Sequence, residues 1–311
     1  MSRAGETPRQ SVCKMEYVKE YVKEYVKMRK FGAPHRLEQE RVNAYFRSQS
    51  LYWKEVYSSG VVEGEIYRER QEAALKWIES LALKPESRVL EIGCGAGFLA
   101  VVLAQRGLHV QAIDSTEAMV ELARQHAVEA GVSRLLTVDL GDVCALTFVD
   151  ASFDLVVALG VIPWLKRPEV ALEEMARVTK QGGHIILTAD NRARLIYLFD
   201  PMSNPALGPI RLLMKDVRAW LRPRVPSSGP LEATHHSLRF IDEALASAGL
   251  AKICGKTLGF GPFTFLCRRV LPVALDLALH HRLQRFADRN VPVLRTKGLH
   301  YLVLARKPES R

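Results

Sequence analysis

Three glycines stand at alternate positions in a short loop at residues 93–97, which reads Gly-Cys-Gly-Ala-Gly. An apolar run at 89–92 precedes the loop and predicts a buried strand, while the apolar run at 98–103 after it predicts a helix. A strand that turns through glycines into a helix lets a ligand approach the backbone and presents unpaired N–H groups to it. A dinucleotide fingerprint would need a further glycine at position 98, where Phe98 stands. The loop therefore predicts a nucleotide-like ligand but does not identify it.

Three carboxylates accompany the glycine loop along the chain. Glu91 precedes it, Asp114 ends a strand-like stretch about 20 residues further on, and Asp142 follows the next such stretch. A carboxylate at the end of the second strand can accept hydrogen bonds from both hydroxyls of a ribose. Asp142 is placed to accept one from an exocyclic adenine amine, with the backbone N–H of Val143 beside it. Asp114 alone would suit NAD equally well, whereas the pair of Glu91 and Asp142 would not.

The elements that must hold these residues alternate between strand and helix. Alternation of this kind predicts an α/β fold, Rossmann-like and doubly wound, with a mostly parallel seven-stranded sheet, a helical N-terminal extension and helical insertions. Ligands of such sheets bind at the carboxyl ends of the strands, where the polar residues fall. We expect strands at 89–92, 109–113, 135–140, 153–159 and 184–189, and helices at 117–129, 169–179 and 238–248.

The ordered set of motifs resembles the class I S-adenosylmethionine-dependent methyltransferases. The resemblance covers roughly residues 65–190 and a closing strand near 298–306, and it implies S-adenosyl-L-methionine as the cofactor. The matching stretches are VLEIGCGAGFLA (89–100), VQAID (110–114), GDV (141–143), FDLVVALGVIPWL (153–165) and VTKQGGHIILT (178–188).

The resemblance also implies a role for each matching position. Glu91 orients the methionine end of the cofactor, the glycine backbone lies under it, Asp114 holds the ribose and Asp142 the adenine. Leu159 and Gly160 line the methionine amino group and the reacting centre. The implied cofactor-binding residues are Glu91, Gly93, Cys94, Gly95, Gly97, Asp114, Ser115, Met119, Asp142, Val143, Leu159 and Gly160.

Two members of that set have an alternative interpretation. Met119 suits packing in a helix at least as well as contact with adenine. Cys94 lies between two glycines, where a small residue is needed, and we interpret it as that rather than as a nucleophile. The five cysteines of the chain are scattered, odd in number and without Cys-x-x-Cys spacing. This pattern indicates reduced thiols in a cytoplasm, without a disulfide framework or a metal site.

Composition and charge limit the classes of protein to which the chain can belong. No stretch approaches the ~20 apolar residues that span a bilayer, and the N-terminal region has no apolar signal core. The formal net charge is +10. Residues 1–30, 201–230 and 252–297 contribute +4, +4 and +7, which leaves −5 for everything else. The basic surplus therefore lies outside the expected cofactor-binding core and favours an anionic surface or substrate as the partner of the added segments.

We expect three parts: a charged repeat tail at 1–30, an N-terminal helical lid at 31–70, and a methyltransferase domain at 71–311 with insertions at 200–236 and 259–297. The tail repeats Glu-Tyr-Val-Lys three times within 16–27. This repeat is either a surface or partner helix or a duplication with little function. The lid is rich in aromatic residues and loosely resembles the first segment of magnesium-protoporphyrin O-methyltransferases. The alternative is that the aromatic side chains of this segment simply pack on the sheet. Arg68 and Arg70 lie at the end of the segment, and one of them is expected to pair with the cofactor carboxylate.

Two added segments, at 210–222 and 263–286, are apolar on one side and basic on the other. Each is too short to span a bilayer but long enough to lie at its surface. Packing of these segments on their own domain is the commoner outcome for such a pattern. The alternative is peripheral contact with a membrane or with a lipid-like substrate, which the arginines of the two segments favour.

Catalysis of methyl transfer requires an acceptor held in line with the carbon–sulfur bond and, for an oxygen acceptor, removal of its proton. The candidate catalytic residues are His235 and His236, which follow the proline-rich insertion, and Asp190, which ends the fifth strand. The two histidines are equally well explained as surface residues at a helix start.

The acceptor class is narrowed by residues 159–164, which read Leu-Gly-Val-Ile-Pro-Trp. Enzymes that methylate nucleic-acid amines carry an Asn/Asp-Pro-Pro-aromatic sequence there, so nucleic acid is an unlikely partner. We expect methylation, most simply at oxygen, of a small hydrophobic acceptor, as in ubiquinone-type O-methyltransferases. The alternatives are a non-catalytic S-adenosylmethionine-binding or scaffold protein and a nucleic-acid methyltransferase. The sequence does not indicate an oligomeric state.

Overall fold

The computed structural model describes residues 34–49, 55–204, 207 and 233–309. The repeat at 16–27, the aromatic residues at 51–53 and the basic segment at 210–222 lie outside the described residues. The chain divides into two compact units, residues 1–48 and 49–311. The described part of the first unit is helix α2 (Pro34–Ser48).

A seven-stranded sheet forms the centre of the second unit, with the strand order β3-β2-β1-β4-β5-β9-β6. The first five strands pair in parallel, and β9 is antiparallel to both of its neighbours. The predicted doubly wound, mostly parallel sheet is confirmed. The strands are β1 (Arg88–Ile92), β2 (His109–Asp114), β3 (Leu136–Leu140), β4 (Phe153–Ala158), β5 (Thr179–Asp190), β6 (Ala251–Leu258) and β9 (His300–Arg306).

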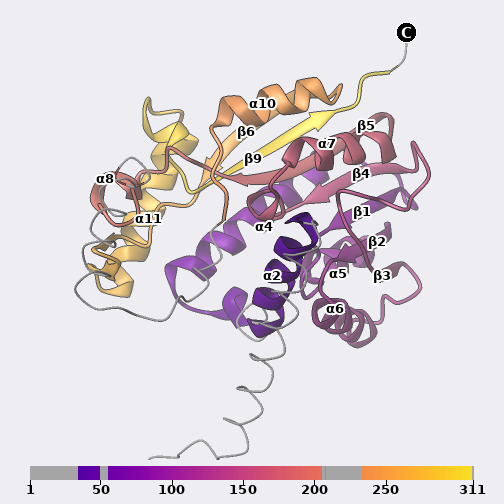
Figure 1. Cartoon of the computed structure of the whole chain (residues 1–311), viewed down its shortest axis with the longest axis horizontal. Coiled ribbons are helices and arrows are strands. Elements are labelled where there is room, and N and C mark those ends of the chain that lie inside the picture. The colour runs from indigo at the N-terminus through magenta and orange to yellow at the C-terminus, as the bar shows by residue number, and fades with distance from the viewer. Residues whose placement is uncertain (1–33, 50–54, 205–206, 208–232, 310–311) are drawn as a thin grey trace, which may run out of the picture. The chain divides into compact units, whose positions relative to one another are not determined.

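Helices cover both faces of the sheet because successive strand residues point to opposite sides (Figure 1). In β1, Val89 belongs to the core beneath α4, α5 and α6, whereas Leu90 belongs to the core beneath α7 and α10. Both residues are fully buried. The helices are α4 (Val62–Ser80), α5 (Phe98–Gln105), α6 (Glu117–Glu129), α7 (Pro168–Val178) and α10 (Leu238–Ser247).

The fifth strand begins earlier than the sequence predicts. We expected it to start at 184, but β5 starts at Thr179, which pairs with Phe153 of β4 before a register shift. The helix before it accordingly ends at Val178. Apolar periodicity does not reveal this early start, because Gly182 and Gly183 interrupt the apolar run within the strand.

The insertion at 259–297 is not a single amphipathic element, as its apolar run suggested. It forms a hairpin of β7 (Thr264–Phe265) and β8 (Arg268–Arg269), followed by α11 (Val273–Asp288) and the short helix η4 (Leu294–Thr296). The helix starts only after Pro272, since proline is tolerated at a helix start but not within it. A small core of its own lies beneath α11, around Phe260 and Phe263.

Helix α4 connects the expected lid to the expected domain without a break. The helix spans 62–80, so a boundary at 70/71 falls inside it. A short helix, η1 (Val56–Ser58), packs against α4 within the same compact unit. Residues 56–70 are therefore structurally part of the second unit.

Candidate active site

The glycine loop has the backbone that its sequence predicts. Gly93, Gly95 and Gly97 have φ angles of 66°, 53° and 82°, a region that other residues seldom adopt. A side-chain carbon added at Gly93 would lie 2.5 Å from Val161 Cγ2, and one added at Gly97 would lie 2.8 Å from Ala123 Cβ. A carbon added at Gly95 would meet no atom within 4 Å. The outer two glycines thus allow close packing within the protein, whereas Gly95 borders open space.

Asp114 lies at the carboxyl end of β2, directly under this loop. Its Oδ2 accepts a hydrogen bond from the Gly95 N–H at 3.0 Å, and its Oδ1 accepts one from the Thr116 N–H at 2.9 Å. Burial raises the pKa of Asp114, and these backbone donors work against that rise. The predicted ribose-binding carboxylate is therefore positioned beside the glycine that borders open space.

Asp142 and Val143 follow β3, the next strand along the sheet edge. Asp142 is exposed, and its Oδ1 accepts a hydrogen bond from the Cys144 N–H at 2.8 Å, which fixes the turn. Val143 is buried in the core against Ile113 and Leu146. The two residues expected at the adenine thus lie at the same end of the sheet as Asp114, because β2 and β3 pair in parallel.

Glu91 is buried within β1, and its Oε2 has no hydrogen-bond partner among the described residues. Burial, and then the nearby charge of Asp114, raise its pKa to about 8, while a backbone N–H of Ala100 works against this rise. A buried carboxylate costs free energy unless it is paired. Glu91 is therefore an acid held out of water at the start of the glycine loop, where the resemblance puts the methionine end of the cofactor.

Arg70 of α4 reaches the loop after β4. A carbon added at Gly160 would lie 2.9 Å from Arg70 Nη1, so the guanidinium covers this glycine. Arg70 Nη2 donates to the Tyr57 hydroxyl at 3.2 Å, and Arg70 Nε has no partner within the described part of the chain. The ring of Tyr57 contacts that of Phe98, the first residue of α5, at 5.2 Å. Arg70 is thus buried where the strand ends meet the glycine loop.

Of the two arginines predicted to meet the cofactor, Arg68 is engaged elsewhere. Its guanidinium donates to the Glu65 carboxylate and to the backbone oxygens of Tyr57 and Ser59. These bonds fix the start of α4. Arg70 is therefore the better candidate for a cofactor carboxylate, since a guanidinium suits bidentate contact with such a group.

The remaining predicted cofactor residues lie close to this set. Leu159 and Gly160 follow β4, and the Gly160 N–H donates to Thr188 Oγ1 at 2.7 Å. Met119, in the first turn of α6, is only 1% exposed, which fits a packing role. Cys94 is buried, and burial, followed by the charges of Glu91 and Asp114, raises the pKa of its thiol well above the usual value. Ser115 directly follows Asp114.

A second polar group lies at the ends of β5 and β9, and it includes a residue that sequence reasoning missed. Asp190 and His300 are register partners across these strands, and His300 Nδ1 lies 3.0 Å from Asp190 Oδ1. Asp190 Oδ2 lies 3.1 Å from Arg194 Nη2 and 3.8 Å from His235 Nε2. The structure thus brings two of the candidate residues, Asp190 and His235, together and adds His300. The signal that could have found His300 is its place at the start of the closing strand.

His236 occupies a different position from its neighbour. Its ring stacks on Phe240 at 4.8 Å with an interplanar angle of 13°, and its Nε2 lies 3.2 Å from Thr234 Oγ1. Its backbone N–H donates to the Asp190 carbonyl at 2.9 Å. His236 therefore fixes the chain beside Asp190 through its backbone, while its side chain contacts α10.

One group in the described residues has the spacing of metal ligands: Glu69, His280 and His281. His280 Nδ1 accepts a hydrogen bond from the Phe260 N–H at 3.1 Å. In a neutral ring the proton is then on Nε2, which faces Glu69 Oε2 at 3.1 Å. A nitrogen that carries a proton offers no lone pair to a metal, so this geometry fits an acid–histidine contact.

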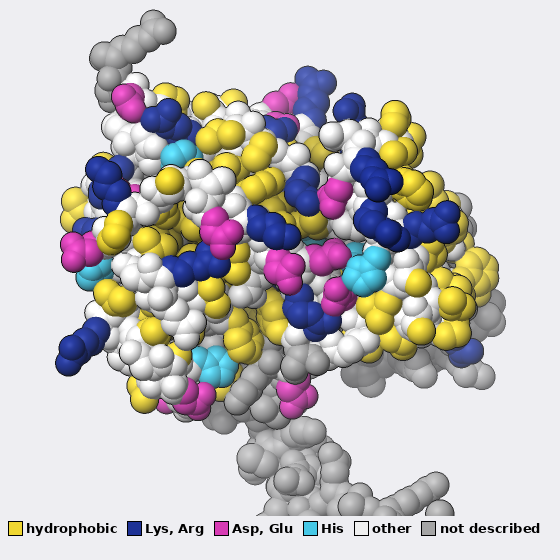
Figure 2. Space-filling view, turned by 180° about the vertical axis from the view of Figure 1, so that it is seen from behind, with side chains coloured by type: hydrophobic (Ala, Val, Ile, Leu, Met, Phe, Trp, Pro, Cys, Tyr) yellow, Lys and Arg dark blue, Asp and Glu magenta, His cyan; other side chains and the backbone are white. Residues whose placement is uncertain are grey.

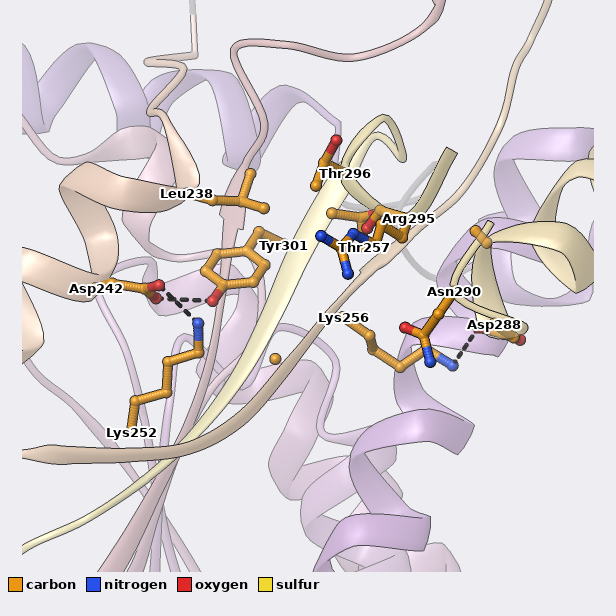
Figure 3. Close-up of a pocket in the computed structure, with 12 residues that line it drawn as sticks. Leu238, Asp242, Lys252, Lys256, Thr257, Asp288, Asn290, Arg295, Thr296 and Tyr301 are labelled. Atoms are coloured by element: carbon orange, nitrogen blue, oxygen red, sulfur yellow. Dashed lines mark hydrogen bonds and ion pairs between the residues drawn. The ribbon is translucent and has the colours of Figure 1, made fainter. Parts of the chain in front are cut away.

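A cavity of about 540 Å³ lies apart from the glycine loop, between α10, α11 and the outer strands β6 and β9 (Figure 3). Tyr301 and Lys252 both contact Asp242 in it, and Lys256 contacts Asp288. Its lysines are thus already paired. The cavity lies on the antiparallel edge of the sheet, and we assign it no part in binding the cofactor.

The part of the chain that carries the glycine loop is similar to known methyltransferases. Residues 90–187 match the family model of the methyltransferase domain. A ubiquinone biosynthesis O-methyltransferase of Pseudomonas aeruginosa (strain UCBPP-PA14) is 32% identical over 155 residues, which are 48% of this chain and 64% of that protein. Its counterpart in Alkalilimnicola ehrlichii is 36% identical over 137 residues, 43% of this chain and 53% of that protein. The chain thus spans less than two thirds of these curated relatives.

Among solved structures, magnesium protoporphyrin IX methyltransferase from Synechocystis PCC 6803 with bound SAH superposes with a TM-score of 0.58. The two are 17% identical, and the match covers 87% of this chain and 99% of that chain. This likeness shows the fold. Together, fold and sequence show that the chain carries a methyltransferase domain at residues 90–187, on a Rossmann-like fold.

Proposed function

We propose that this methyltransferase moves the methyl group of S-adenosylmethionine to a hydroxyl of a small, hydrophobic acceptor. The observation that carries the proposal is the open space at Gly95, whose N–H is bonded by Asp114, together with Arg70, which lies against Gly160 at the end of β4. The chemistry that the cofactor supplies is a methyl group on a sulfonium, already activated for displacement. The protein has mainly to hold the acceptor oxygen in line with that group, which can supply most of the rate.

Each cofactor-binding residue has a distinct task in this proposal. Asp114 accepts hydrogen bonds from the ribose, and Asp142 accepts one from the adenine amine. Arg70 pairs with the methionine carboxylate, and Glu91 faces the methionine end. The glycine backbone at 93–97 provides the surface on which the cofactor lies.

The hydrophobic character of the acceptor is supported by what lies beyond the strand ends. Aromatic rings of Tyr57, Tyr67 and Tyr197 border the two polar groups. The curated relatives are named as O-methyltransferases of ubiquinone biosynthesis. An acceptor oxygen on a ring with apolar substituents fits both observations.

Peripheral contact with a membrane belongs to the same proposal. An apolar patch, formed by Leu198, Phe199, Phe265, Leu266, Val270, Val273 and Leu275, is between 41% and 72% exposed. Phe199 packs on Phe263 at 5.9 Å, which joins helix α8 (Ile196–Phe199) to the hairpin. Hydrophobic side chains gather at this end of the molecule with basic ones beside them (Figure 2), and Arg282 and Arg285 of α11 are exposed, as is Arg289 directly after the helix. Among the described residues, no helix is long and apolar enough to cross a bilayer. A cytoplasmic location at an anionic membrane surface is the proposed setting.

Calorimetric titration with S-adenosylmethionine tests the cofactor part of the proposal. Asp114→Ala and Asp142→Ala should each weaken binding by about tenfold or more, since each removes hydrogen bonds to the ligand. Asp139→Ala is the matched control, because Asp139 is exposed on β3 and contacts Arg124 and Gln111 at the surface. Equal affinity in all three variants and the parent would contradict the assignment.

Co-sedimentation with vesicles tests the membrane part. The protein should pellet with phosphatidylglycerol vesicles at low salt, and less at high salt, because screening weakens the attraction. Replacing Phe265 and Leu266 by Ser should reduce pelleting. Replacing Val128 and Val149 by Ser is the control, because these residues are 70% and 77% exposed elsewhere on the surface. No pelleting at low salt would exclude the contact.

A further inference from the structure

Asp190 and His300 form a dyad whose geometry resembles that of an activated base. The Asp190 carboxylate accepts the Nδ1 proton of His300 at 3.0 Å, across paired strands that hold both residues in place. A carboxylate on one ring nitrogen fixes the tautomer and leaves the other nitrogen with a free lone pair. For His300 that nitrogen is Nε2, which is buried and has no hydrogen-bond partner among the described residues.

The dyad lies beside the proposed methionine end of the cofactor. The ring of Tyr67 lies 6.0 Å from that of His300, and the Arg70 guanidinium lies 4.8 Å from the Tyr67 ring centre. Arg70 in turn covers Gly160, the residue expected at the reacting centre. Nε2 is buried here, so side chains around it would have to move to admit a hydroxyl.

We propose that His300 is the catalytic base of the methyl transfer, with Asp190 as the group that positions it. This step rests on the proposed function above. The His300 Nε2 lone pair takes the proton of the acceptor hydroxyl while an oxygen lone pair forms the bond to the methyl carbon. The carbon–sulfur bond breaks, and its electron pair stays on sulfur. The proton leaves on His300, whose imidazolium is stabilised by the Asp190 carboxylate until it is released to water.

The surroundings of Asp190 distinguish His300 from His235. Burial alone would raise the pKa of Asp190, but the hydrogen bond from His300 and the positive charge of Arg194 outweigh it and hold that pKa well below its usual range. The carboxylate therefore remains ionised to support the base. His235 Nε2 lies 3.8 Å from it, too far for a hydrogen bond, and burial followed by the charge of Arg194 lowers the pKa of His235 to about 4.

The charged groups around His300 come from three elements: Asp190 from β5, Arg194 from the chain after it, and Arg70 from α4. Burial, opposed by Asp190, lowers the pKa of His300, so the ring is neutral and able to accept a proton near neutral pH. A general base of this kind contributes about 10²–10⁴-fold to a rate.

The test compares two acceptor probes, 4-tert-butylcatechol and the more acidic 4-nitrocatechol, with the full-length protein. His300→Asn keeps a side-chain donor toward Asp190 but lacks the Nε2 base. We expect kcat for tert-butylcatechol to fall by about 100-fold or more. The fold-decrease in kcat should be smaller with nitrocatechol, and smaller at higher pH, because an acceptor that is already ionised needs no base. His184→Asn, in the middle of β5 and away from Asp190, is the matched control and should keep the parent rate.

Four outcomes decide between the proposals. If the parent methylates neither probe, the proposed phenolic hydroxyl acceptor fails, and the proposed role of His300 fails with it. If the parent is active and His300→Asn keeps the same rate and pH profile, only the role of His300 is overturned. A loss that is equal for both probes at every pH would indicate a structural role and also contradicts the base. If His235→Asn shows the acidity-dependent loss instead, the base is His235. Melting temperature and S-adenosylmethionine affinity, measured on each variant, should match those of the parent.

Discussion

The two halves of the proposed site, one for the cofactor and one for the acceptor, are built in different ways. The cofactor half, at the ends of β1 to β4, consists largely of backbone and of residues a few positions from a strand end. The acceptor half, at the ends of β5 and β9, is assembled from side chains far apart in the sequence: Asp190, His235 and His300, with Tyr67 from α4. A cofactor common to a family can be held by a local loop, whereas an acceptor is recognised by tertiary contacts particular to one chain.

A large effect on stability is expected at Asp200, which joins the chain after α8 to the β7–β8 hairpin. Asp200 is fully buried and accepts hydrogen bonds from Thr264 Oγ1 at 2.6 Å and from the N–H groups of Cys267 and Met202 at 3.0 and 2.9 Å. Asp200→Ala leaves three donors without their acceptor, so unfolding free energy should fall by about 2–4 kcal/mol. Urea unfolding measures this, with the exposed Asp139→Ala as control.

The same variant tests whether the halves are separable. S-adenosylmethionine affinity in Asp200→Ala, measured below the melting temperature, should equal that of the parent protein. A tenfold loss of affinity would show that the hairpin and α8 also shape the cofactor half.

Arg70 should show the next largest effect, this time on the cofactor half. Arg70→Met removes a charge-assisted contact to the cofactor carboxylate, worth about 1.5–3 kcal/mol, or about 10- to 150-fold in affinity. The loss should appear with S-adenosylhomocysteine and vanish with 5′-methylthioadenosine, which has no carboxylate. Arg68→Met provides the comparison. If both ligands lose affinity equally, Arg70 acts on the shape of the site instead.

A separate comparison concerns the pH dependence of stability. The Glu91 pKa is about 8 in the folded chain and 4.5 in the reference state, so the folded form binds more protons between these values. Stability should therefore fall as pH rises from about 4.5 to 8, by about 1.4 kcal/mol for each unit of raised pKa. Glu91→Gln should flatten this slope in urea unfolding.

Glu174 offers the opposite sign as a control. A hydrogen bond from Arg177 lowers its pKa, so it stabilises the fold above its unfolded pKa, and this contribution is lost as pH falls. Glu174→Gln should therefore remove stability near neutral pH and leave the slope due to Glu91 in place. An unchanged slope in Glu91→Gln would mean that Glu91 is ionised in the folded protein.

The difference between the halves also explains which parts of the site could be predicted from the sequence and which could not. The strand–glycine–helix order, Asp114 and Asp142 follow from local spacing, and the structure has them at one edge of the sheet. His300 was missed because its partner Asp190 is 110 residues away, and only the antiparallel pairing of β9 brings them together. The segment at 263–286 was likewise read as one amphipathic element, because periodicity alone does not show that Pro272 ends a hairpin and starts a helix.

The most direct test of the cofactor site compares Gly95→Ala with Gly107→Ala by calorimetric titration of S-adenosylmethionine. Both glycines have positive φ, 53° and 81°, and an added carbon at either would meet no protein atom within 4 Å. Both variants should therefore lose similar stability, about 1–2 kcal/mol. The account predicts that Gly95→Ala loses most of its S-adenosylmethionine affinity while Gly107→Ala keeps that of the parent. Equal affinity in the two variants would contradict the placement of the cofactor over Gly95.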